Sequence, residues 1–307
     1  MDKKVSIITI NYNGLDDTIE MLESFREHET YPYEIIIIDN ASKNPDEHRT
    51  LKEYQPHAQV IRSDKNLGFA GGNNLGIPYI NGDYVLFLNN DTIIIEPVLE
   101  NLSRVLDDNP QVGSVSPKIA CWPEKRRLQY AGATPMSPIT LRNENIGFNQ
   151  IDEGQFDRSC DTAFTHGAAM MIRTADLKAF GLMPEFYFLY YEELDWCVQI
   201  QRVGFTIRYE PKSTIYHKES MSVGKESPLQ VYYHTRNRLL FAKRTINSKH
   251  NRIRSYFYQI AIAFPKRFLF SLAKGKFKLI PPLCKGVING LIAINKDMNY
   301  GKNLSNH

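Results

Sequence analysis

The sequence predicts a three-layer α/β fold, in which helices cover both faces of a parallel β-sheet. Two observations carry this prediction. Short β-branched segments alternate with stretches of helical period, and the segment EIIIID at Glu34–Asp39 is apolar on both of its alternating faces. Strands that alternate with helices pair in parallel, and a strand that is apolar on both faces is covered on both sides.

The first half of the chain alternates strictly between strands and helices, beginning and ending with a strand. In such sheets a ligand binds beyond the carboxyl ends of the strands. Polar residues follow every predicted strand, which is the first indication of a functional site. The predicted elements are Val5–Tyr12, Asp16–Glu29, Glu34–Asp39, Thr50–Tyr54, Ala58–Arg62, Asn73–Ile80 and Tyr84–Leu88, and the polar residues are Asn11, Asn13, Asp39, Asn40, Asp64, Asn66 and Asn89 to Asp91.

The second half is less regular. The segment Cys121–Asp161 is rich in proline, glycine, asparagine and charge, and it is interpreted as a long excursion over a pocket. Helices are predicted at Pro97–Asp107, at Glu192–Val203 and from Ser227 onward, and strands at Val112–Pro117, Ala168–Ile172, Phe205–Glu210 and Ser213–His217.

The composition is that of a globular protein, with 42% hydrophobic and 23% charged residues among 307. It excludes wholesale disorder, collagen and a disulfide-stapled mini-protein. The formal net charge of +3 hides an uneven distribution: Lys243–His307 holds 13 basic residues and one acid, whereas the remainder is acidic by nine charges. An acidic body with a basic tail indicates an anionic surface as a partner.

The four cysteines are far apart and form no CxxC pair, so neither a zinc cluster nor a disulfide framework is expected. Reduced thiols fit a cytoplasmic location. The N-terminus runs directly into a strand-like segment and has no signal-peptide pattern. No uninterrupted stretch of about 18 apolar residues occurs, so no transmembrane helix is predicted.

The stretch Asn66–Gly76, NLGFAGGNNLG, contains four glycines, which permit positive φ angles and close approach of the backbone to a ligand. It matches neither the G-x-G-x-x-G fingerprint nor the phosphate loop G-x-x-x-x-G-K-[ST]. A Rossmann dehydrogenase and a P-loop NTPase are therefore disfavoured, and a simple turn is the alternative interpretation.

Asn89-Asn90-Asp91 follows a buried apolar strand directly. Carboxylate oxygens at a strand end suit Mg²⁺ or Mn²⁺ bridging a diphosphate, although a turn-forming Asn/Asp cluster would look the same. His217 ends another predicted strand. It is either a structural or surface histidine or, if it lies beside Asp91 in space, a second metal ligand.

The segment Tyr191–Trp196, YEELDW, places three carboxylates in the first turn of a helix. Interaction with the helix dipole accounts for acids at this position in general. Here they follow the aromatic run Phe186–Phe188, and an apolar wall together with mutual repulsion would raise one pKa, as a general base requires.

Taken together and in this order, these segments resemble family 2 glycosyltransferases of the GT-A fold, in the rhamnosyltransferase-like branch. The resemblance covers roughly Val5–Lys243. It is carried by VSIITINYNG at Val5–Gly14, EIIIIDNAS at Glu34–Ser42, NLGFAGGNNLGI at Asn66–Ile77, YVLFLNNDT at Tyr84–Thr92, HGAAMMIR at His166–Arg173, FYFLYYEELDWCVQIQRVGF at Phe186–Phe205 and YYHTRNRLLF at Tyr232–Phe241.

The resemblance implies a role for each matching residue. Asp39 resembles the residue that hydrogen-bonds the pyrimidine base of the donor. Asp91 resembles the last acid of the metal-binding D-x-D motif, with Asn89 in place of the first acid, and His217 resembles an additional ligand for Mn²⁺ or Mg²⁺. The resemblance also implies donor-binding positions at Asn11, Asn66 and Gly71, and places Arg236 in an Arg-Asn pair near the diphosphate or the acceptor.

Glu193 holds the second place of the family's Glu-Asp pair, where the general base usually lies. Glu192 and Asp195 compete for this role, because glutamate in place of aspartate moves the carboxylate by about one methylene. The implied activity is metal-dependent inverting transfer of a hexosyl or deoxyhexosyl unit from a dTDP- or UDP-sugar to a saccharide acceptor, lipid-linked, in surface polysaccharide synthesis. A sugar nucleotidyltransferase and a catalytically silent GT-A binding module are the alternatives.

The predicted organisation is a catalytic domain at 1–242, with a donor nucleotide half at about 1–95 and an acceptor half at 96–242, followed by a basic helical extension at 243–307. Basic residues interleave with aromatic ones over Asn251–Asn295. This pattern is typical of helices in a membrane interface, and a helical subdomain with a solvated basic face is the alternative. No nucleic-acid-binding motif accompanies the basic residues. We therefore expect a cytoplasmic protein that is peripheral on the inner face of the cell membrane.

Overall fold

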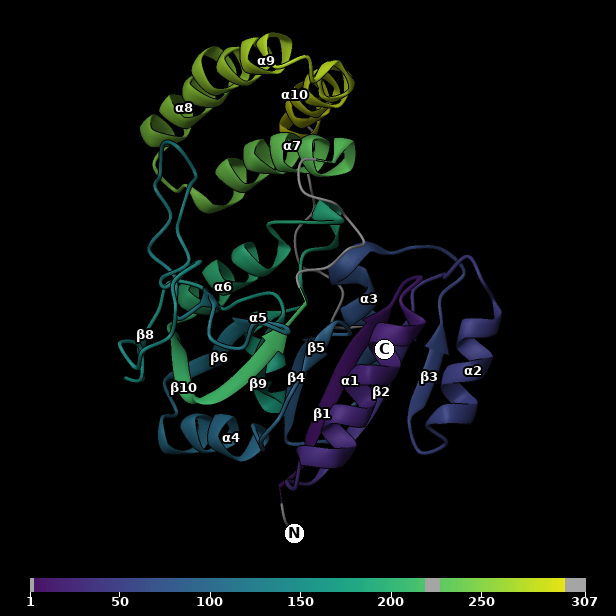
Figure 1. The fold of residues 1–307 in the computed structure, drawn as a ribbon. Helices are drawn as coiled ribbons and strands as arrows, with labels where there is room; N and C mark the ends of the chain where they lie inside the picture. Colours follow the sequence, from purple (N-terminus) through teal and green to yellow (C-terminus); the bar gives the residue numbers. More distant parts are fainter. Residues whose placement is uncertain (1–2, 219–226, 296–307) are drawn as a thin grey trace.

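The computed structural model describes residues 3–218 and 227–295. The first half has the predicted alternation of strands and helices (Figure 1). Its elements are β1 (Val5–Asn11), α1 (Leu15–His28), β2 (Tyr33–Asp39), α2 (Asp46–Tyr54), β3 (Gln59–Arg62), α3 (Gly68–Gly76), the 3₁₀ turn η1 (Ile77–Tyr79) and β4 (Tyr84–Asn89).

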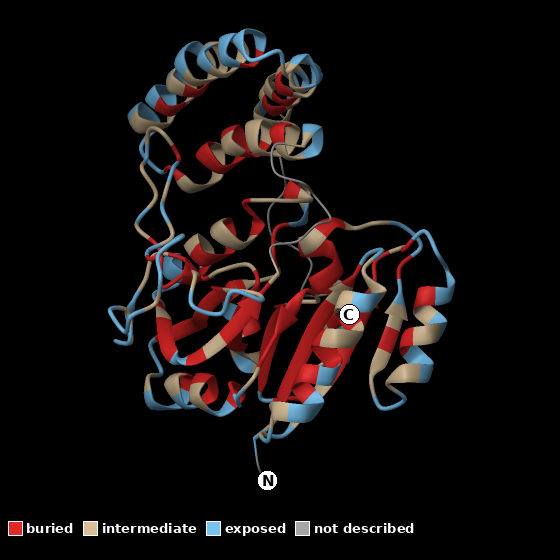
Figure 2. Ribbon diagram, viewed as in Figure 1, coloured by how far each residue is buried: buried red, intermediate tan, exposed pale blue. Residues whose placement is uncertain are grey.

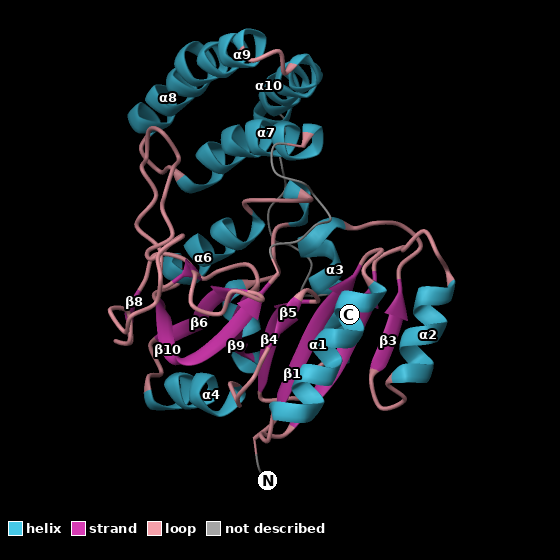
Figure 3. Cartoon of the chain, in the orientation of Figure 1, coloured by secondary structure: helices cyan, strands magenta, loops and turns pink. Residues whose placement is uncertain are grey.

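The remainder of the body supplies the other half of the sheet (Figure 3). The two strands predicted at 205–217 form one strand, β10, whose pairing with β6 shifts register between Glu210 and Thr214. The elements are β5 (Thr92–Ile93), α4 (Leu99–Asp108), β6 (Val112–Cys121), β7 (Leu128–Tyr130), β8 (Cys160–Asp161), β9 (Ala169–Arg173), the 3₁₀ turn η2 (Thr174–Asp176), α5 (Leu177–Phe180), the 3₁₀ turn η3 (Glu185–Tyr187), α6 (Glu192–Arg202) and β10 (Thr206–His217).

The sheet is mixed, which corrects the prediction of a parallel sheet. The strands lie in the order β3-β2-β1-β4-β9-β6-β10-β5, with β7 paired to β6 and β8 paired to β10. Pairing is parallel among β3, β2, β1 and β4, but β9 is antiparallel to both β4 and β6. The prediction holds where single crossover helices join the strands. It fails at β9, which follows the long irregular excursion.

Strand register shows how the layers form. Ile8 of β1 is paired with Phe87 of β4, so their side chains point to the same face of the sheet. Helix α3 lies against Ile8 at Gly76, and Trp196 of α6 packs edge-to-face on Phe87 at 5.4 Å. Helices α3 and α6 therefore cover one face together. Burial of each such large side chain contributes about 1.5–3 kcal/mol, and these residues lie in the buried centre of the body (Figure 2).

The C-terminal helices form a separate layer above the body (Figure 1). Helix α7 begins at Ser227, whose Oγ accepts a hydrogen bond from the Gln230 N–H at 3.1 Å. The predicted boundary at 242/243 falls inside α7. The layer consists of α7 (Pro228–Thr245), α8 (Lys249–Phe257), a π-helical segment (Tyr258–Ala263), α9 (Phe264–Ala273), the 3₁₀ turn η6 (Phe277–Leu279) and α10 (Ile280–Asn295).

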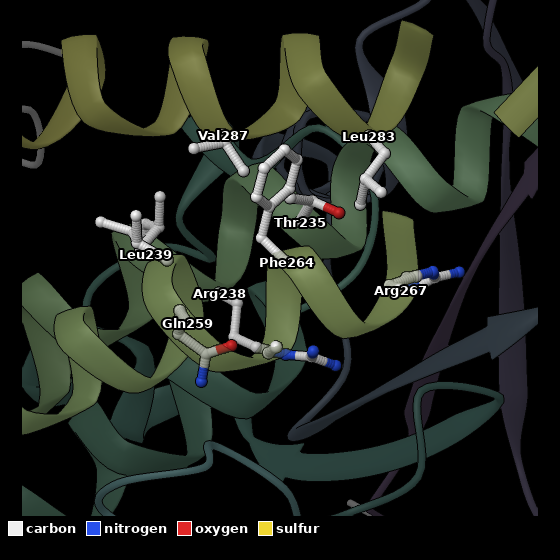
Figure 4. Close-up of a pocket in the computed structure, with 10 residues that line it drawn as sticks. Thr235, Arg238, Leu239, Gln259, Phe264, Arg267, Leu283 and Val287 are labelled. Carbon is white, nitrogen blue, oxygen red and sulfur yellow. The ribbon is translucent and has the colours of Figure 1, made fainter. Parts of the chain in front are cut away.

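Two glycines allow α10 to pack closely on α7. A Cβ atom at Gly286 would lie 2.8 Å from Cβ of Thr235, and one at Gly290 would lie 2.7 Å from Leu239. Where α7, the π-helical segment, α9 and α10 meet, the gap between Thr235, Leu239, Phe264, Leu283 and their neighbours is only about 30 Å³ (Figure 4). This is room for about one water, so the layer is well packed.

One helical stretch, Phe277–Asn295, is long and apolar enough to cross a membrane, judged by length and composition only. The sequence analysis predicted no such helix. The sequence of this stretch contains Lys278 and Lys285 among its apolar residues.

Candidate active site

The predicted donor residues meet at the carboxyl ends of β1 and β2, where Asn11 and Asp39 are register partners. Asp39 is fully buried. Its carboxylate accepts a hydrogen bond from the Ser42 N–H at 3.0 Å and forms an ion pair with Arg62. Arg62 also donates to the Ser42 carbonyl at 3.0 Å. Asp39 is thus a neutralised and positioned carboxylate at the edge of the sheet.

The Asn11 side chain is fully buried at this edge. Its amide donates to Ser42 Oγ at 3.1 Å and to the Glu47 carboxylate at 2.8 Å, and it accepts from Thr18 Oγ1 at 2.9 Å. Both amide hydrogens are therefore used within the protein. Through these hydrogen bonds Asn11 holds the segments next to Asp39 in place.

Asn66 connects the end of β2 to the start of α3. Its Oδ1 accepts from Asn40 Nδ2 at 3.2 Å and from the Gly68 N–H at 2.8 Å, while Asn40 Oδ1 accepts from the Leu67 N–H at 2.9 Å. These reciprocal bonds hold the chain where it enters α3.

The glycine-rich stretch is mostly helix α3, which corrects the prediction of a loop followed by a helix from Asn73. Gly68 is the one glycine of the stretch with positive φ, +73°, and a Cβ there would lie 2.1 Å from the carbonyl oxygen of Phe188. Gly71 lies inside the helix, against Leu67 and Glu185. The close backbone approach for which glycine is needed is therefore between two segments of the chain.

Asp91 and His217 are brought together, 126 positions apart in the sequence, at the end of the sheet. Oδ1 of Asp91 lies 3.1 Å from Nε2 of His217, and Asn89 Nδ2 lies 3.4 Å from the same nitrogen. Both side chains are buried, and Asp91 Oδ2 has no hydrogen-bond partner among the described residues. An unpaired buried carboxylate oxygen is costly, and a divalent cation would satisfy it.

Gln129 determines which nitrogen of His217 faces Asp91. Its Nε2 donates to the His217 carbonyl at 2.9 Å, so its Oε1 must be the atom that lies 2.7 Å from His217 Nδ1. Nδ1 therefore donates to Gln129, and Nε2 is the nitrogen that faces the Asp91 carboxylate. When Nε2 carries no proton it can bind a cation, with Gln129 as the outer hydrogen-bond partner of the histidine.

Few side chains at this point could serve as metal ligands. Among residues 3–218 and 227–295, no group of three or more His, Cys, Asp or Glu side chains surrounds a common point. Asp91 and His217, with the Asn89 amide oxygen if the amide is turned, fit a hard divalent cation that takes its remaining ligands from a diphosphate and water.

His166 was quoted in a motif by the sequence analysis but given no role. Its ring lies 5.9 Å from that of His217 and 5.5 Å from that of Tyr130. Its Nδ1 accepts from the Ala168 N–H at 3.1 Å. Burial, reinforced by His217, lowers the pKa of His166 to about 3. His166 is therefore a neutral ring that lies beside His217.

The three carboxylates at the start of α6 have different surroundings. Asp195 is fully buried and ion-paired with Arg244, and it accepts hydrogen bonds from the Tyr187 hydroxyl at 2.7 Å and from Gln199 at 3.1 Å. Its carboxylate oxygens are thus already bonded to groups of η3, α6 and α7. Asp195 instead anchors α7 to α6.

Glu192 and Glu193 have no such counterion in the part of the chain that the structure describes. Burial, and then the charge of Glu193, raises the pKa of Glu192 well above its ordinary value, and its Oε2 has no hydrogen-bond partner among the described residues. Burial also raises the pKa of Glu193. Glu193 is the less buried of the two and lies against Gly167, with its carboxyl carbon 3.8 Å from where a Cβ on Gly167 would be. Gly167 follows His166, so the Glu193 carboxyl lies on the same side as the metal candidates.

The backbone before α6 is strained, because Phe188, Tyr190 and Tyr191 have φ angles of 68°, 68° and 79°. Non-glycine residues rarely adopt such angles. Asn237 of α7, fully buried, holds this backbone with one amide nitrogen that donates to the carbonyls of Tyr187, Leu189 and Tyr190 at 3.1, 2.8 and 2.9 Å. Glu192 and Glu193 follow directly, so Asn237 determines where α6 begins.

Arg236, expected near a diphosphate or the acceptor, donates to the carbonyls of Phe186 and Tyr187 at 2.7 and 3.3 Å. Neither Asp39 nor Asp91 is among the hydrogen-bond partners found for Arg236 in the described residues. With Asn237 it forms a backbone clamp on residues 186–190. The sequence analysis quoted the Arg-Asn pair but did not foresee this bonding, because donors to backbone carbonyls leave no sequence signature.

Comparison with known proteins places these features in a family. Residues 6–180 match the family model described as "Glycosyl transferase family 2". The chain is 26% identical over 296 residues to the low-salt glycan biosynthesis hexosyltransferase Agl10 of Haloferax volcanii, covering 94% of this chain and 91% of that protein. It is 20% identical to the N-acetylglucosaminyl-diphospho-decaprenol L-rhamnosyltransferase of Mycobacterium tuberculosis, covering 78% and 84%.

The fold has solved relatives as well. The mannosyltransferase PcManGT from Pyrobaculum calidifontis, in complex with GDP-Man and Mn²⁺, superposes with a TM-score of 0.57 at 15% identity, covering 95% of this chain and 88% of that one. This likeness shows a GT-A glycosyltransferase fold. Together with the family match over more than half of the chain, it identifies the protein as a member of glycosyl transferase family 2.

Proposed function

We propose that this glycosyltransferase transfers a hexosyl or deoxyhexosyl unit from a dTDP- or UDP-sugar to a saccharide acceptor, with inversion and with a divalent metal. The observation that carries the proposal is the pairing of two features on one side of the sheet. They are the Asp91–His217 pair with its unsatisfied carboxylate oxygen, and the uncompensated Glu193 carboxyl beyond His166.

Asp91 and His217 would hold Mn²⁺ or Mg²⁺, which supplies neutralising charge to the departing diphosphate when bound. Gln129 keeps the His217 proton on Nδ1, so that Nε2 is available as a ligand. On the nucleotide side, Asp39 would accept a hydrogen bond from the base, and Arg62 would hold that carboxylate in place. The supporting precedent is PcManGT, which was crystallised with a nucleotide sugar and Mn²⁺.

Glu193 would act as the base. Its carboxylate takes the proton of the attacking acceptor hydroxyl, whose oxygen bonds to the anomeric carbon from the face opposite the nucleotide. The bond from the anomeric carbon to the diphosphate oxygen breaks, and that oxygen leaves with its electron pair, as in other displacements through oxocarbenium-like transition states. A carboxyl whose pKa is raised by burial is a stronger base for this step.

The acceptor would be lipid-linked, and the helical layer would bring the enzyme to it. Residues 251–295 contain no acidic residue. They also hold nine of the sixteen large apolar side chains that are exposed in the described part of the chain: Ile253, Phe257, Ile262, Leu269, Phe270, Leu272, Phe277, Ile288 and Ile292. Exposed aromatic and aliphatic side chains among lysines and arginines favour an anionic membrane surface. The decaprenol-linked acceptor named for the mycobacterial relative supports this assignment.

Helix α10 would lie along the membrane surface and not cross it. Gly286 and Gly290 press one of its faces against α7. We accordingly propose a peripheral protein of the inner membrane face, which should sediment with phosphatidylglycerol vesicles but not with phosphatidylcholine vesicles. A failure to bind either would refute the membrane assignment.

The activity is tested by incubating the protein with dTDP-rhamnose and a panel of UDP-sugars, with Mn²⁺ or Mg²⁺, and with or without EDTA. Release of nucleoside diphosphate that EDTA abolishes is the expected result. Release of pyrophosphate from a sugar phosphate and a nucleoside triphosphate would instead identify a nucleotidyltransferase. Binding of a donor without turnover would identify a silent binding module.

A further inference from the structure

A hollow of about 460 Å³ lies between the segment before α6 and the helical layer. Its walls are Phe186 and Phe188, then Tyr232, Tyr233 and Arg236 of α7, and Asn289, Ile292 and Ala293 of α10. None of the predicted metal or base residues lines it, and among the predicted donor residues only Arg236 does. The hollow is therefore a separate site that adjoins the candidate active site.

The position of the hollow relative to the base follows from the bonds on either side of Phe188. On one side, the Phe188 carbonyl accepts from the Phe69 N–H of α3 at 2.9 Å, which joins it to the donor half. On the other side, the Phe188 ring stacks on Tyr233 of α7, with centroids 5.2 Å apart and planes at 18°. The hollow opens on this α7 side. Phe188 thus links the donor half to the hollow, and α6, which carries Glu193, begins four residues after it.

The lining has the chemistry of a carbohydrate subsite. Aromatic rings offer flat apolar faces to the C–H face of a sugar, while a few convergent polar groups fix its orientation. Asn289 Nδ2 donates to the Tyr232 hydroxyl at 2.8 Å, so this pair presents an amide oxygen and a hydroxyl at the wall. Among the described residues no carboxylate lines the hollow, and the Arg236 guanidinium lies 5.8 Å from the centre of the Tyr233 ring. The hollow therefore combines stacking surfaces with one positive charge.

The hollow is also continuous with the apolar face of α10. Ile292 forms part of its rim and is 51% exposed, and Ile288, one turn earlier on the same helix, is 57% exposed. A ligand with a sugar ring in the hollow and a lipid chain at its other end would leave past Ile292. The Arg236 guanidinium, which also lines the hollow, suits a diphosphate link.

We infer that this hollow is the acceptor subsite, which takes the sugar ring of a saccharide diphosphate attached to a lipid. The ring lies among Phe188, Tyr232 and Tyr233, and the diphosphate lies near Arg236. This inference rests on the proposed function, because it assigns a second substrate to the same reaction. The inference names the side chains that would select the acceptor, and these lie on α7 and α10 as well as on the catalytic body.

The test uses the full-length chain and N-acetylglucosaminyl diphosphate on a short isoprenyl chain, soluble without membranes, with the donor that the activity screen identifies. Ile292→Trp would fill the hollow from its exposed rim, and Ile288→Trp is the matched control, equally exposed on the same helix but outside the lining. We expect Ile292→Trp to raise the KM for the acceptor by about tenfold or more. The KM for the donor and the slow hydrolysis of the donor by water should stay at the level of Ile288→Trp.

Asn289→Ala provides a second variant if Ile292→Trp does not fold, and it should also raise the acceptor KM selectively. Equal acceptor KM values for Ile292→Trp and Ile288→Trp, or for Asn289→Ala and the wild type, would overturn the assignment. If the wild type neither hydrolyses nor transfers from any nucleotide sugar, the proposed function itself has failed. Donor hydrolysis by every variant, combined with unchanged acceptor KM, isolates failure of the subsite.

Discussion

The carboxyl ends of β1 and β2, here called the donor edge, differ from the start of α6 in how their buried polar groups are paired. At the donor edge, Asp39 is neutralised by Arg62, and the amide hydrogens of Asn11 are both bonded. At the start of α6, Glu192 is buried and Glu193 half-buried, neither has a counterion among the described residues, and burial raises the pKa of both. The first arrangement fixes shape and charge, whereas the second holds groups whose protonation is easily changed.

The sharpest test of this contrast is Glu193→Gln. The amide cannot take up a proton, so transfer should fall by about 10²–10⁴-fold, while donor affinity stays unchanged because the donor edge lies elsewhere. Turnover is measured by release of nucleoside diphosphate, and donor affinity by calorimetry. Glu192→Gln, the isosteric change at the neighbouring residue, should lose less. A larger loss in Glu192→Gln would exchange the two roles.

The next effect concerns the metal. Gln129→Leu removes the hydrogen bond to Nδ1 of His217, so the ring can turn or change tautomer. Affinity for Mn²⁺ in the presence of nucleoside diphosphate should weaken by about 10–100-fold. Gln155→Leu, at an exposed position in the same excursion, is the control. Equal Mn²⁺ affinities in the two variants would show that Gln129 does not position His217.

Asn237→Ala removes the three hydrogen bonds that hold the left-handed residues before α6. At about 0.5–1.5 kcal/mol for each bond, the free energy of unfolding should fall by about 2–3 kcal/mol. The value of kcat should fall while the donor KM is retained, since Glu193 loses its position and the donor edge does not. Asn247→Ala, at an exposed site beyond the end of α7, should do neither. Retention of full kcat in a destabilised Asn237→Ala would limit the clamp to a structural role.

The smallest effect is on stability against pH. Because burial raises the pKa of Glu192, the folded state keeps a proton that the unfolded state has lost at any pH between the ordinary and the raised value. Stability therefore falls as pH rises through this window. Glu192→Gln stays neutral, so its Tm should exceed that of the wild type at pH 8, and the difference should vanish near pH 4. The gain is about 1.4 kcal/mol per unit of pKa shift. A difference in Tm that is the same at all pH values would contradict a raised pKa of Glu192.

Much of the donor half could be predicted from the sequence. A run such as EIIIID at Glu34–Asp39 buries its apolar side chains as a strand that is covered on both faces. The polar residues that follow parallel strands then meet at one end of the sheet. The pairing of Asp91 with His217 was predicted only through the family resemblance. The two residues are far apart in the sequence, and no local pattern brings β4 and β10 together.

The role of Asn66–Gly76 and of the Arg-Asn pair could not be predicted. Gly68 is glycine because the carbonyl of Phe188 lies where its Cβ would be. Arg236 and Asn237 hold backbone carbonyls, and their partners in the segment before α6 carry no special residue type. Contacts with the main chain are invisible in a sequence, because every residue has the same carbonyl.

The sequence by itself determined the alternating α/β core, the polar strand ends and the basic, aromatic tail, because these follow from side-chain hydrophobicity and charge read locally. Only the tertiary structure decided that β9 runs antiparallel, that Asp195 is neutralised by Arg244, and that Glu192 and Glu193 are not neutralised. The physical reason is that a pKa depends on the distance to a counterion and on burial. Both are set by packing between segments that lie far apart in the chain.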